Sequence, residues 1–166
     1  MVFTLIGMPG CGKSCMGKAV SGKLKLRNID SDHLIERAEG KKLWQLIEER
    51  GLEGFKELEE KMLLTFSEDN CILSTGGSAI YYDDAMMHLK SLGKVIYLKV
   101  GLDIIKERLG DFSKRGIVLR KGQTIDDLYK ERCELYEKYA DITINCNGTA
   151  FPRYHAALIE EIKKYL

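Results

Sequence analysis

The residues at positions 7–14 have the types and the spacing of a phosphate-binding loop. They match the pattern G-x-x-x-x-G-K-[ST] and lie between an apolar strand-like run and a helix-forming run. Glycines there let backbone N–H groups turn toward phosphate oxygens, and the N-terminus of the following helix adds a favourable dipole. Lys13 would bring positive charge to the β and γ phosphates, and the Ser14 hydroxyl would ligate Mg²⁺. The expected nucleotide contacts are Gly10, Cys11, Gly12, Lys13, Ser14 and Cys15.

This loop predicts binding of ATP with Mg²⁺, and an ordinary glycine-rich turn is the alternative. Cys15 stands where many such loops have a second hydroxyl residue. Because a thiol is a poorer hydrogen-bond donor than a hydroxyl, we expect a lower nucleotide affinity.

Two carboxylates, Asp30 and Asp32, follow the second strand-like run. Carboxylates at a strand end that faces a phosphate loop suit the positioning of a metal ion and of a hydroxyl group. The alternative is that either aspartate only caps the next helix, as aspartates often do.

The elements that must position these groups alternate between strand and helix. Each short apolar run is followed by a longer helix-like stretch, which predicts an α/β fold with helices on both faces of a parallel sheet. The fold would be a three-layer sandwich, with a five-stranded parallel sheet between two layers of helices. The expected strands are 2–6, 27–29, 71–74, 95–98 and 142–145.

Two stretches exceed what plain connections need. Residues from about 32 to 68 predict a helical insertion, broken near Gly40 and again near 51–54, that would bind the substrate. Residues from about 111 to 122 predict a mobile basic lid over the phosphate site. Leu43, Trp44, Leu46 and Ile47 form an apolar helical stripe that we expect to pack into the core of the insertion.

Length and charge limit the other classes of protein. The 166 residues fit one domain covering 1–166, and a monomer is expected. A net charge of +1 gives no general case for nucleic acid or an anionic membrane as partner. No apolar run approaches the roughly 18–20 residues that span a bilayer, and no basic leader is seen. The odd number of cysteines, 5, without zinc-ligand spacing predicts reduced thiols in the cytoplasm.

Taken together, the motifs resemble those of the shikimate kinase family. An Asp-x-Asp element, a Phe-Arg-x-x-Glu element, a Gly-Gly-Gly turn, an Arg-Pro-Leu-Leu lid and an Arg-x-x-Leu-Tyr element occur there in this order. Their counterparts here are Asp30-Ser31-Asp32, Phe55-Lys56-Glu57-Leu58-Glu59, Gly76-Gly77-Ser78, a lid element starting at Arg115, and Arg132-Cys133-Glu134-Leu135-Tyr136. The resemblance covers nearly the whole chain and implies a P-loop kinase fold.

The resemblance also implies a reaction, the transfer of the γ-phosphoryl group of ATP to the 3-hydroxyl of shikimate. Asp32 would bind the substrate hydroxyls and is the candidate to take the proton of the attacking hydroxyl. Asp30 would hold magnesium-bound water, and Arg132 would pair with the substrate carboxylate. Arg115 would swing in with the lid to neutralise the transferring phosphoryl group, and Arg108 would lie near the adenine.

The remaining implied substrate contacts are Lys56, Glu59, Gly76, Gly77 and Ser78. Glu59 would support the basic group at position 56 from one helical turn away, with an exposed ion pair as the alternative. The two glycines would let backbone amides approach the substrate, or would form a plain turn. Arg108, Arg115 and Arg132 have solvated surface charges as their alternative.

Three departures keep other functions open. Lys56 stands for an arginine, Ser78 for the third glycine and Gly116 for the lid proline of the family. A lysine is a point charge and lacks the two-pronged grip of arginine on a carboxylate. The alternatives are a kinase for another small acceptor, such as gluconate or a nucleoside monophosphate, and a nucleotide-binding regulatory module without catalysis.

Overall fold

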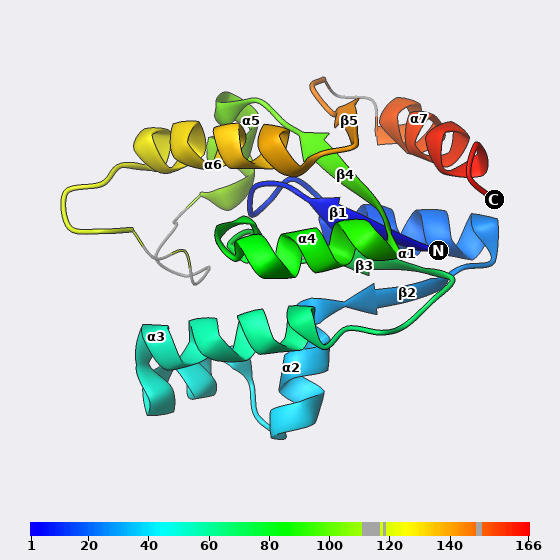
Figure 1. Cartoon of the computed structure of the whole chain (residues 1–166). Coiled ribbons are helices and arrows are strands. Elements are labelled where there is room, and N and C mark those ends of the chain that lie inside the picture. The colour runs from blue at the N-terminus through cyan, green and yellow to red at the C-terminus, as the bar shows by residue number, and fades with distance from the viewer. Residues whose placement is uncertain (111–116, 118, 149–150) are drawn as a thin grey trace.

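The computed structural model describes the backbone of residues 1–110, 117, 119–148 and 151–166. Strands and helices alternate along most of this length, as the sequence predicts (Figure 1). In chain order the elements are β1 (Val2–Ile6), α1 (Lys13–Leu24), β2 (Arg27–Asp30), α2 (Ser31–Glu39), α3 (Leu43–Leu64), β3 (Cys71–Ser74), the 3₁₀ helix η1 (Ala79–Tyr81), α4 (Asp83–Leu92), β4 (Gly93–Lys99), α5 (Leu102–Leu109), α6 (Ile125–Tyr139), β5 (Ile142–Asn145) and α7 (Phe151–Lys163).

The five strands form one parallel sheet in the order β2-β3-β1-β4-β5. The predicted five-stranded parallel sheet is therefore confirmed, with small changes in the bounds of two strands. Strand β2 continues to Asp30, and β4 runs from Gly93 to Lys99. Every residue of the central strand β1 is buried, as expected for a strand covered on both faces.

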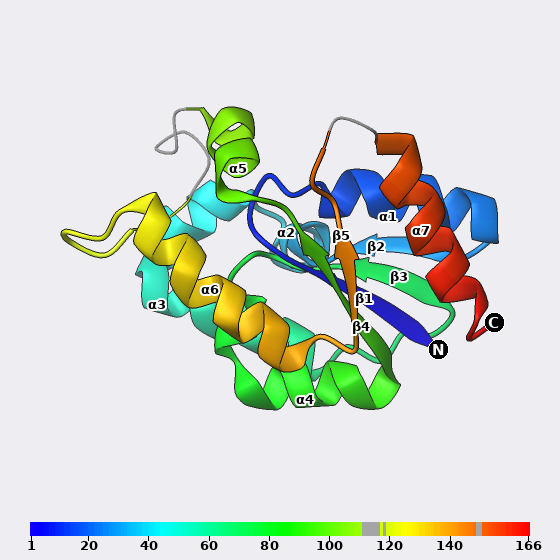
Figure 2. The ribbon, with the colours of Figure 1, turned by 90° about the horizontal axis from the view of Figure 1, so that it is seen from above.

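Helices cover both faces of the sheet, which confirms the predicted three layers. Seen from above, α1 and α7 lie on one side of the strands and α4 and α6 on the other (Figure 2). Helices α2 and α3 pack against each other beside the β2 edge of the sheet (Figure 1). The predicted breaks in this region are confirmed, because Gly40 ends α2 at φ 67° and Gly51 interrupts α3 at φ 71°.

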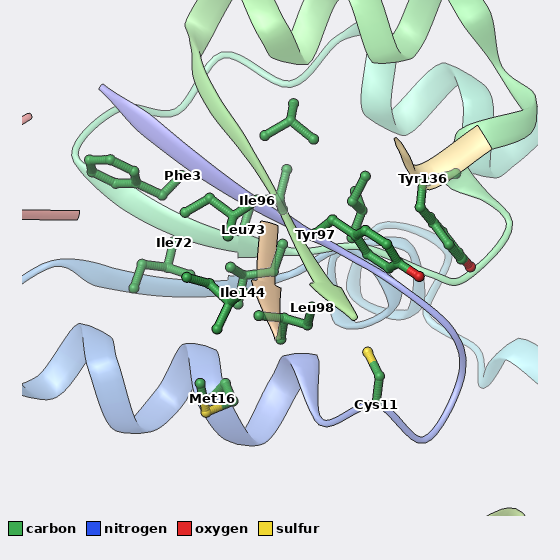
Figure 3. Packing of buried hydrophobic residues seen from close by; sticks show 14 of the residues in the cluster. Phe3, Cys11, Met16, Ile72, Leu73, Ile96, Tyr97, Leu98, Tyr136 and Ile144 are labelled. Atoms are coloured by element: carbon green, nitrogen blue, oxygen red, sulfur yellow. The ribbon is translucent and has the colours of Figure 1, made fainter. Parts of the chain in front are cut away.

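The apolar core lies on both sides of the sheet and holds the strands in place (Figure 3). Met16 of α1 packs into it from one side, and Tyr97 and Tyr136 stack with ring centroids 5.1 Å apart. Each such large side chain stabilises the fold by about 1.5–3 kcal/mol when fully buried. The loops that follow β1, β2 and β3 are thereby fixed at one edge of the sheet, where parallel α/β folds bind ligands. Among the described helices, none has the length and apolar character needed to cross a membrane.

Candidate active site

The phosphate loop connects β1 to α1, and its backbone requires glycine at the helix start. Gly12 caps α1 at φ 99°, a left-handed conformation that side chains with a Cβ rarely adopt. The next residue, Lys13, is only 9% exposed. Its ammonium donates hydrogen bonds to the carbonyls of Gly7 at 2.7 Å and Met8 at 3.1 Å. The loop thus gathers one cation and the N-terminus of α1 at the carboxyl end of the central strand.

Ser14 and Asp30 meet across the loop from neighbouring elements. The Ser14 hydroxyl donates to Oδ2 of Asp30 at 2.6 Å, while Oδ1 of Asp30 accepts the backbone N–H of Asp32 at 3.0 Å and caps α2. The capping role considered for Asp30 is therefore confirmed, and the contact with Ser14 is an addition that the sequence did not predict. Hydroxyl and carboxylate oxygens are hard ligands of the kind that Mg²⁺ accepts.

The oxygen atoms near Ser14 suit a Mg²⁺ ion that has few protein ligands, and they do not form a site in which the protein alone surrounds the metal. Among the described residues, no group of three His, Cys, Asp or Glu side chains is arranged to hold a metal ion. Mg²⁺ usually takes one or two protein oxygens and completes its shell with phosphate oxygens and water. The Ser14 and Asp30 oxygens match that pattern.

Asp32 lies in the cleft next to two other carboxylates. Burial, together with the negative charges of Asp30 and Glu59, raises the pKa of its carboxyl to about 6, while Lys13 and His33 act in the opposite direction. Asp32 therefore changes protonation close to neutral pH, which suits a group that accepts a proton during a reaction.

Glu59 is a buried carboxylate, 1% exposed, held by two hydroxyl groups. Its Oε2 accepts hydrogen bonds from Ser78 at 2.7 Å and from Tyr82 at 2.8 Å. Its Oε1 lies against Gly76, where a Cβ would collide with it. A side chain at position 76 would therefore have to displace this carboxylate.

The expectation that Glu59 supports Lys56 is wrong in this structure. The Lys56 ammonium instead pairs with Glu53, one helical turn earlier, at 2.9 Å. The Lys56 side chain is 44% exposed, so this is the exposed ion pair considered as the alternative, with a different partner. Glu59 instead accepts hydrogen bonds from the hydroxyls of Ser78 and Tyr82 inside the fold.

Arg132 is a buried cation on α6, only 8% exposed, so it is not a surface charge. Its Nε donates to the Tyr81 hydroxyl at 3.4 Å, and its guanidinium lies 5.4 Å from the centre of the Tyr81 ring. A Cβ on Gly77 would lie 3.0 Å from its Nη1, so glycine leaves room for the guanidinium. No described carboxylate lies within ion-pair distance of Arg132. A buried cation without an anionic partner favours binding of an anionic ligand group.

One cleft of about 880 Å³ brings most of the predicted residues together. On one side it reaches the phosphate loop, and on the other it reaches α3, the turn after β3, and α6. The predicted site residues that line it are Gly10, Gly12, Lys13, Ser14, Cys15, Asp30, Asp32, Lys56, Glu59, Gly76, Gly77, Ser78 and Arg132. Cys11 is buried behind the loop instead, with its Sγ 3.7 Å from the Lys13 ammonium.

The expected core position of Trp44 is wrong. Its side chain is 64% exposed and lines the cleft, as do Leu43 and Ile47. Of the four stripe residues only Leu46 is buried, at 0% exposed. The stripe is wider than the face of α3 that packs against its neighbours, and the rest of it forms an apolar wall of the cleft.

The remaining predicted residues concern the nucleotide and the lid. Arg108 is exposed and donates from Nη1 to the carbonyl of Gly10 at 3.2 Å, which places it beside the phosphate loop. Arg115 and most of the lid, 111–116 and 118, lie outside the described residues. Of the part that is described, Ile117 and Arg120 line the cleft.

Sequence reasoning missed Tyr81, Tyr82 and Glu131. Tyr82 binds Glu59, while Tyr81 lies between Arg132 and Glu131. The adjacent tyrosines come shortly after the Gly-Gly-Ser turn, separated from it by Ala79 and Ile80, and that position after a strand was the one signal that could have pointed to them.

Comparison with known proteins gives a consistent result. The family model for shikimate kinase matches residues 9–164. A shikimate kinase of Clostridium botulinum strain 657 is 37% identical over 149 residues, covering 87% of this chain and 88% of that protein. A shikimate kinase of the Langeland strain is 35% identical and covers 98% and 95%. The solved shikimate kinase of Acinetobacter baumannii in complex with shikimate superposes with a TM-score of 0.88 at 29% identity, covering 99% of this chain and 93% of that one.

Proposed function

The chain belongs to the shikimate kinase family, and on that premise we propose that it transfers the γ-phosphoryl group of ATP to the 3-hydroxyl of shikimate. The observation that carries the proposal is the position of Arg132. This buried cation, which has no described carboxylate partner, faces the same cleft as the phosphate loop. The cleft therefore pairs an acid-binding end with a phosphate-binding end.

At the acid end, Arg132 would bind the substrate carboxylate, because a guanidinium can grip both of its oxygens. Gly76 and Gly77 would let the substrate lie close to the backbone, with Ser78 and Glu59 beside them. Lys56 would leave Glu53 and add a second positive charge. These contacts would fix the orientation of the shikimate ring. The activation barrier is then lower, because the entropy of orienting the substrate is lost on binding and not in the chemical step.

At the phosphate end, Lys13 would neutralise the β and γ phosphates within the loop formed by Gly10, Cys11, Gly12, Ser14 and Cys15. Ser14, and Asp30 through a water molecule, would hold Mg²⁺, which supplies charge neutralisation to the phosphates when bound. Arg108 would lie near the adenine, since it already contacts Gly10. Arg115, in the lid, would neutralise the transferring phosphoryl group.

Between the two ends, Asp32 would accept the proton of the attacking hydroxyl. With a pKa of about 6 its carboxylate is mostly ionised at neutral pH and is still basic enough to take a proton. Burial, together with the neighbouring charges of Asp30 and Glu59, keeps that pKa above the ordinary value of an aspartate. The oxygen that loses its proton then attacks the γ phosphorus in line with the leaving ADP.

We propose that the 166 residues act as one catalytic unit, because the sheet, helix α3 and helix α6 all line the same cleft. A monomer is the simplest form, since a single chain is enough to supply both the phosphate-binding end and the acid-binding end of the cleft. A cytoplasmic location is supported by the five free cysteines, which suit a reducing compartment.

The decisive test measures ADP release with Mg²⁺-ATP and a panel of acceptors: shikimate, gluconate and nucleoside monophosphates. We expect turnover with shikimate alone, and a loss of about 10²–10³-fold in kcat for Lys13→Ala, because one charge-stabilising group is removed. Turnover only with another acceptor would replace shikimate as the substrate. ATP binding without turnover on any acceptor would favour a regulatory module.

A further inference from the structure

Tyr81 occupies a position between two opposite charges at the acid end of the cleft. It is the last residue of η1, the short helix that begins directly after the Gly-Gly-Ser turn. Its hydroxyl accepts a hydrogen bond from Nε of Arg132 at 3.4 Å and donates one to Oε1 of Glu131 at 2.9 Å. Its ring lies 5.4 Å from the Arg132 guanidinium, within the range of a cation–π contact.

Glu131 directly precedes Arg132 on α6, yet its carboxylate is bound by other groups. Besides Tyr81, its oxygens accept hydrogen bonds from Nη2 of Arg120 at 3.3 Å and from Nε2 of Gln123 at 3.2 Å. Arg120 and Gln123 lie just before α6 and line the cleft. Three donors thus satisfy the carboxylate without Arg132.

This arrangement matters because Glu131 is the natural competitor of the substrate. A carboxylate next in sequence to a buried arginine would gain much from pairing with it in a low-dielectric site. An arginine that is already paired binds a second carboxylate poorly, since its donors are occupied and its charge is neutralised. The neutral hydroxyl of Tyr81 takes up Nε of Arg132, and the Tyr136 hydroxyl also interacts with this guanidinium. Both partners are uncharged hydroxyl groups, so they leave the positive charge of Arg132 for the substrate.

We infer that Tyr81 is a positioning residue for the carboxylate of the substrate, and that it acts by holding Arg132 and Glu131 apart. The inference rests on the proposed function, because it assumes an acceptor that carries a carboxylate. The ring supports the face of the guanidinium, and the hydroxyl directs Glu131 toward Arg120 and Gln123. In this role Tyr81 acts through Arg132 and Glu131 and not on the reacting atoms.

The test compares kcat/KM of the unaltered chain and Tyr81→Phe on shikimate and on its methyl ester, which lacks the charge. The phenylalanine keeps the ring and loses the hydroxyl. We expect a loss of about tenfold on shikimate, chiefly through KM, as for a hydrogen bond to a charged group. On the ester the change should stay below about twofold. Equal losses on acid and ester, or no loss on the acid, would overturn the inference.

A matched control and a rescue variant complete the design. Tyr165 is as exposed as Tyr81, at 38%, and is not among the residues that line the cleft, so Tyr165→Phe should leave both rates unchanged. In the Tyr81→Phe background, Glu131→Gln removes the competing charge. The double variant should have a kcat/KM on shikimate about threefold or more above that of Tyr81→Phe alone. If Glu131→Gln does not raise kcat/KM on shikimate, the inference that Tyr81 keeps Glu131 away from Arg132 is wrong. Absence of shikimate turnover in the unaltered chain would overturn the proposed function and this inference together.

Discussion

The hydroxyl of Ser78 donates a hydrogen bond of 2.7 Å to Oε2 of Glu59, a carboxylate from a helix 19 positions earlier in the chain. Glu59 is 1% exposed, and Tyr82 supplies its second hydroxyl donor at 2.8 Å. A buried carboxylate is stabilised only as far as donors replace the water it has lost. The serine that replaces the third glycine of the family turn therefore has a definite structural role.

Ser78→Ala should lower the free energy of unfolding by about 1–2 kcal/mol, because one hydrogen bond to a buried charge is lost. Urea unfolding at neutral pH measures the change. Ser91→Ala is the control, since the Ser91 hydroxyl is exposed and binds only a helix carbonyl; its effect should stay within about 0.5 kcal/mol. Equal effects of the two variants would remove the role assigned to Ser78.

The fall of kcat/KM at low pH, the acid limb of the pH profile, should follow the protonation of the Asp32 carboxylate. Its pKa is raised to about 6, so the carboxyl becomes neutral as the pH falls through that value and can no longer accept a proton. We expect kcat/KM for shikimate to be constant above about pH 7 and to fall toward tenfold per pH unit well below pH 6.

Glu59→Gln tests the cause of that shift. Removing a negative charge that raises the pKa of Asp32 should move the acid limb to lower pH, while burial and Asp30 keep part of the shift. Glu57→Gln, an exposed carboxylate on the same helix, is the control and should leave the limb in place. A limb that stays near pH 6 in Glu59→Gln would contradict the assignment to Asp32.

Trp44 and Leu46 should differ sharply in their effect on stability. Leu46→Ala removes a side chain that is 0% exposed and should cost about 2–5 kcal/mol. Trp44→Ala removes a larger side chain that is 64% exposed, and should change the free energy of unfolding by less than about 0.5 kcal/mol. Urea unfolding of both variants decides the matter. A cost of several kcal/mol for Trp44→Ala would restore the core position expected from the sequence.

The sequence predicted the fold well because its signals are periodic and local. Apolar runs bounded by loops place five strands, and glycines at positions 40 and 51 mark breaks that the backbone shows as left-handed conformations. The phosphate loop is equally local, since its function lies in consecutive residues. Hence its place between β1 and α1 was predicted correctly.

The direction in which side chains point was harder to predict, because it depends on partners far along the chain. Helical spacing placed Lys56 and Glu59 on one face of α3. It gave no sign of the Ser78 and Tyr82 hydroxyls, which bind Glu59 inside the fold. For the same reason an apolar stripe predicted burial of Trp44 without revealing that this part of α3 faces a cleft.

Lys56 should matter for the substrate and hardly at all for stability. Its exposed pair with Glu53 at i,i+3 is worth no more than about 0.5 kcal/mol, so Lys56→Gln should leave urea unfolding nearly unchanged. If the ammonium leaves Glu53 for the substrate carboxylate, Lys56→Gln should raise KM for shikimate by about threefold to tenfold. Arg132→Gln should raise it more, because a buried guanidinium binds a carboxylate more firmly than a point charge does. Lys163→Gln breaks the same kind of exposed pair, with Glu160, on α7 away from the cleft, and should leave KM unchanged. Equal KM values for Lys56→Gln and Lys163→Gln would leave Arg132 as the cation that binds the acid, and would remove Lys56 from the site.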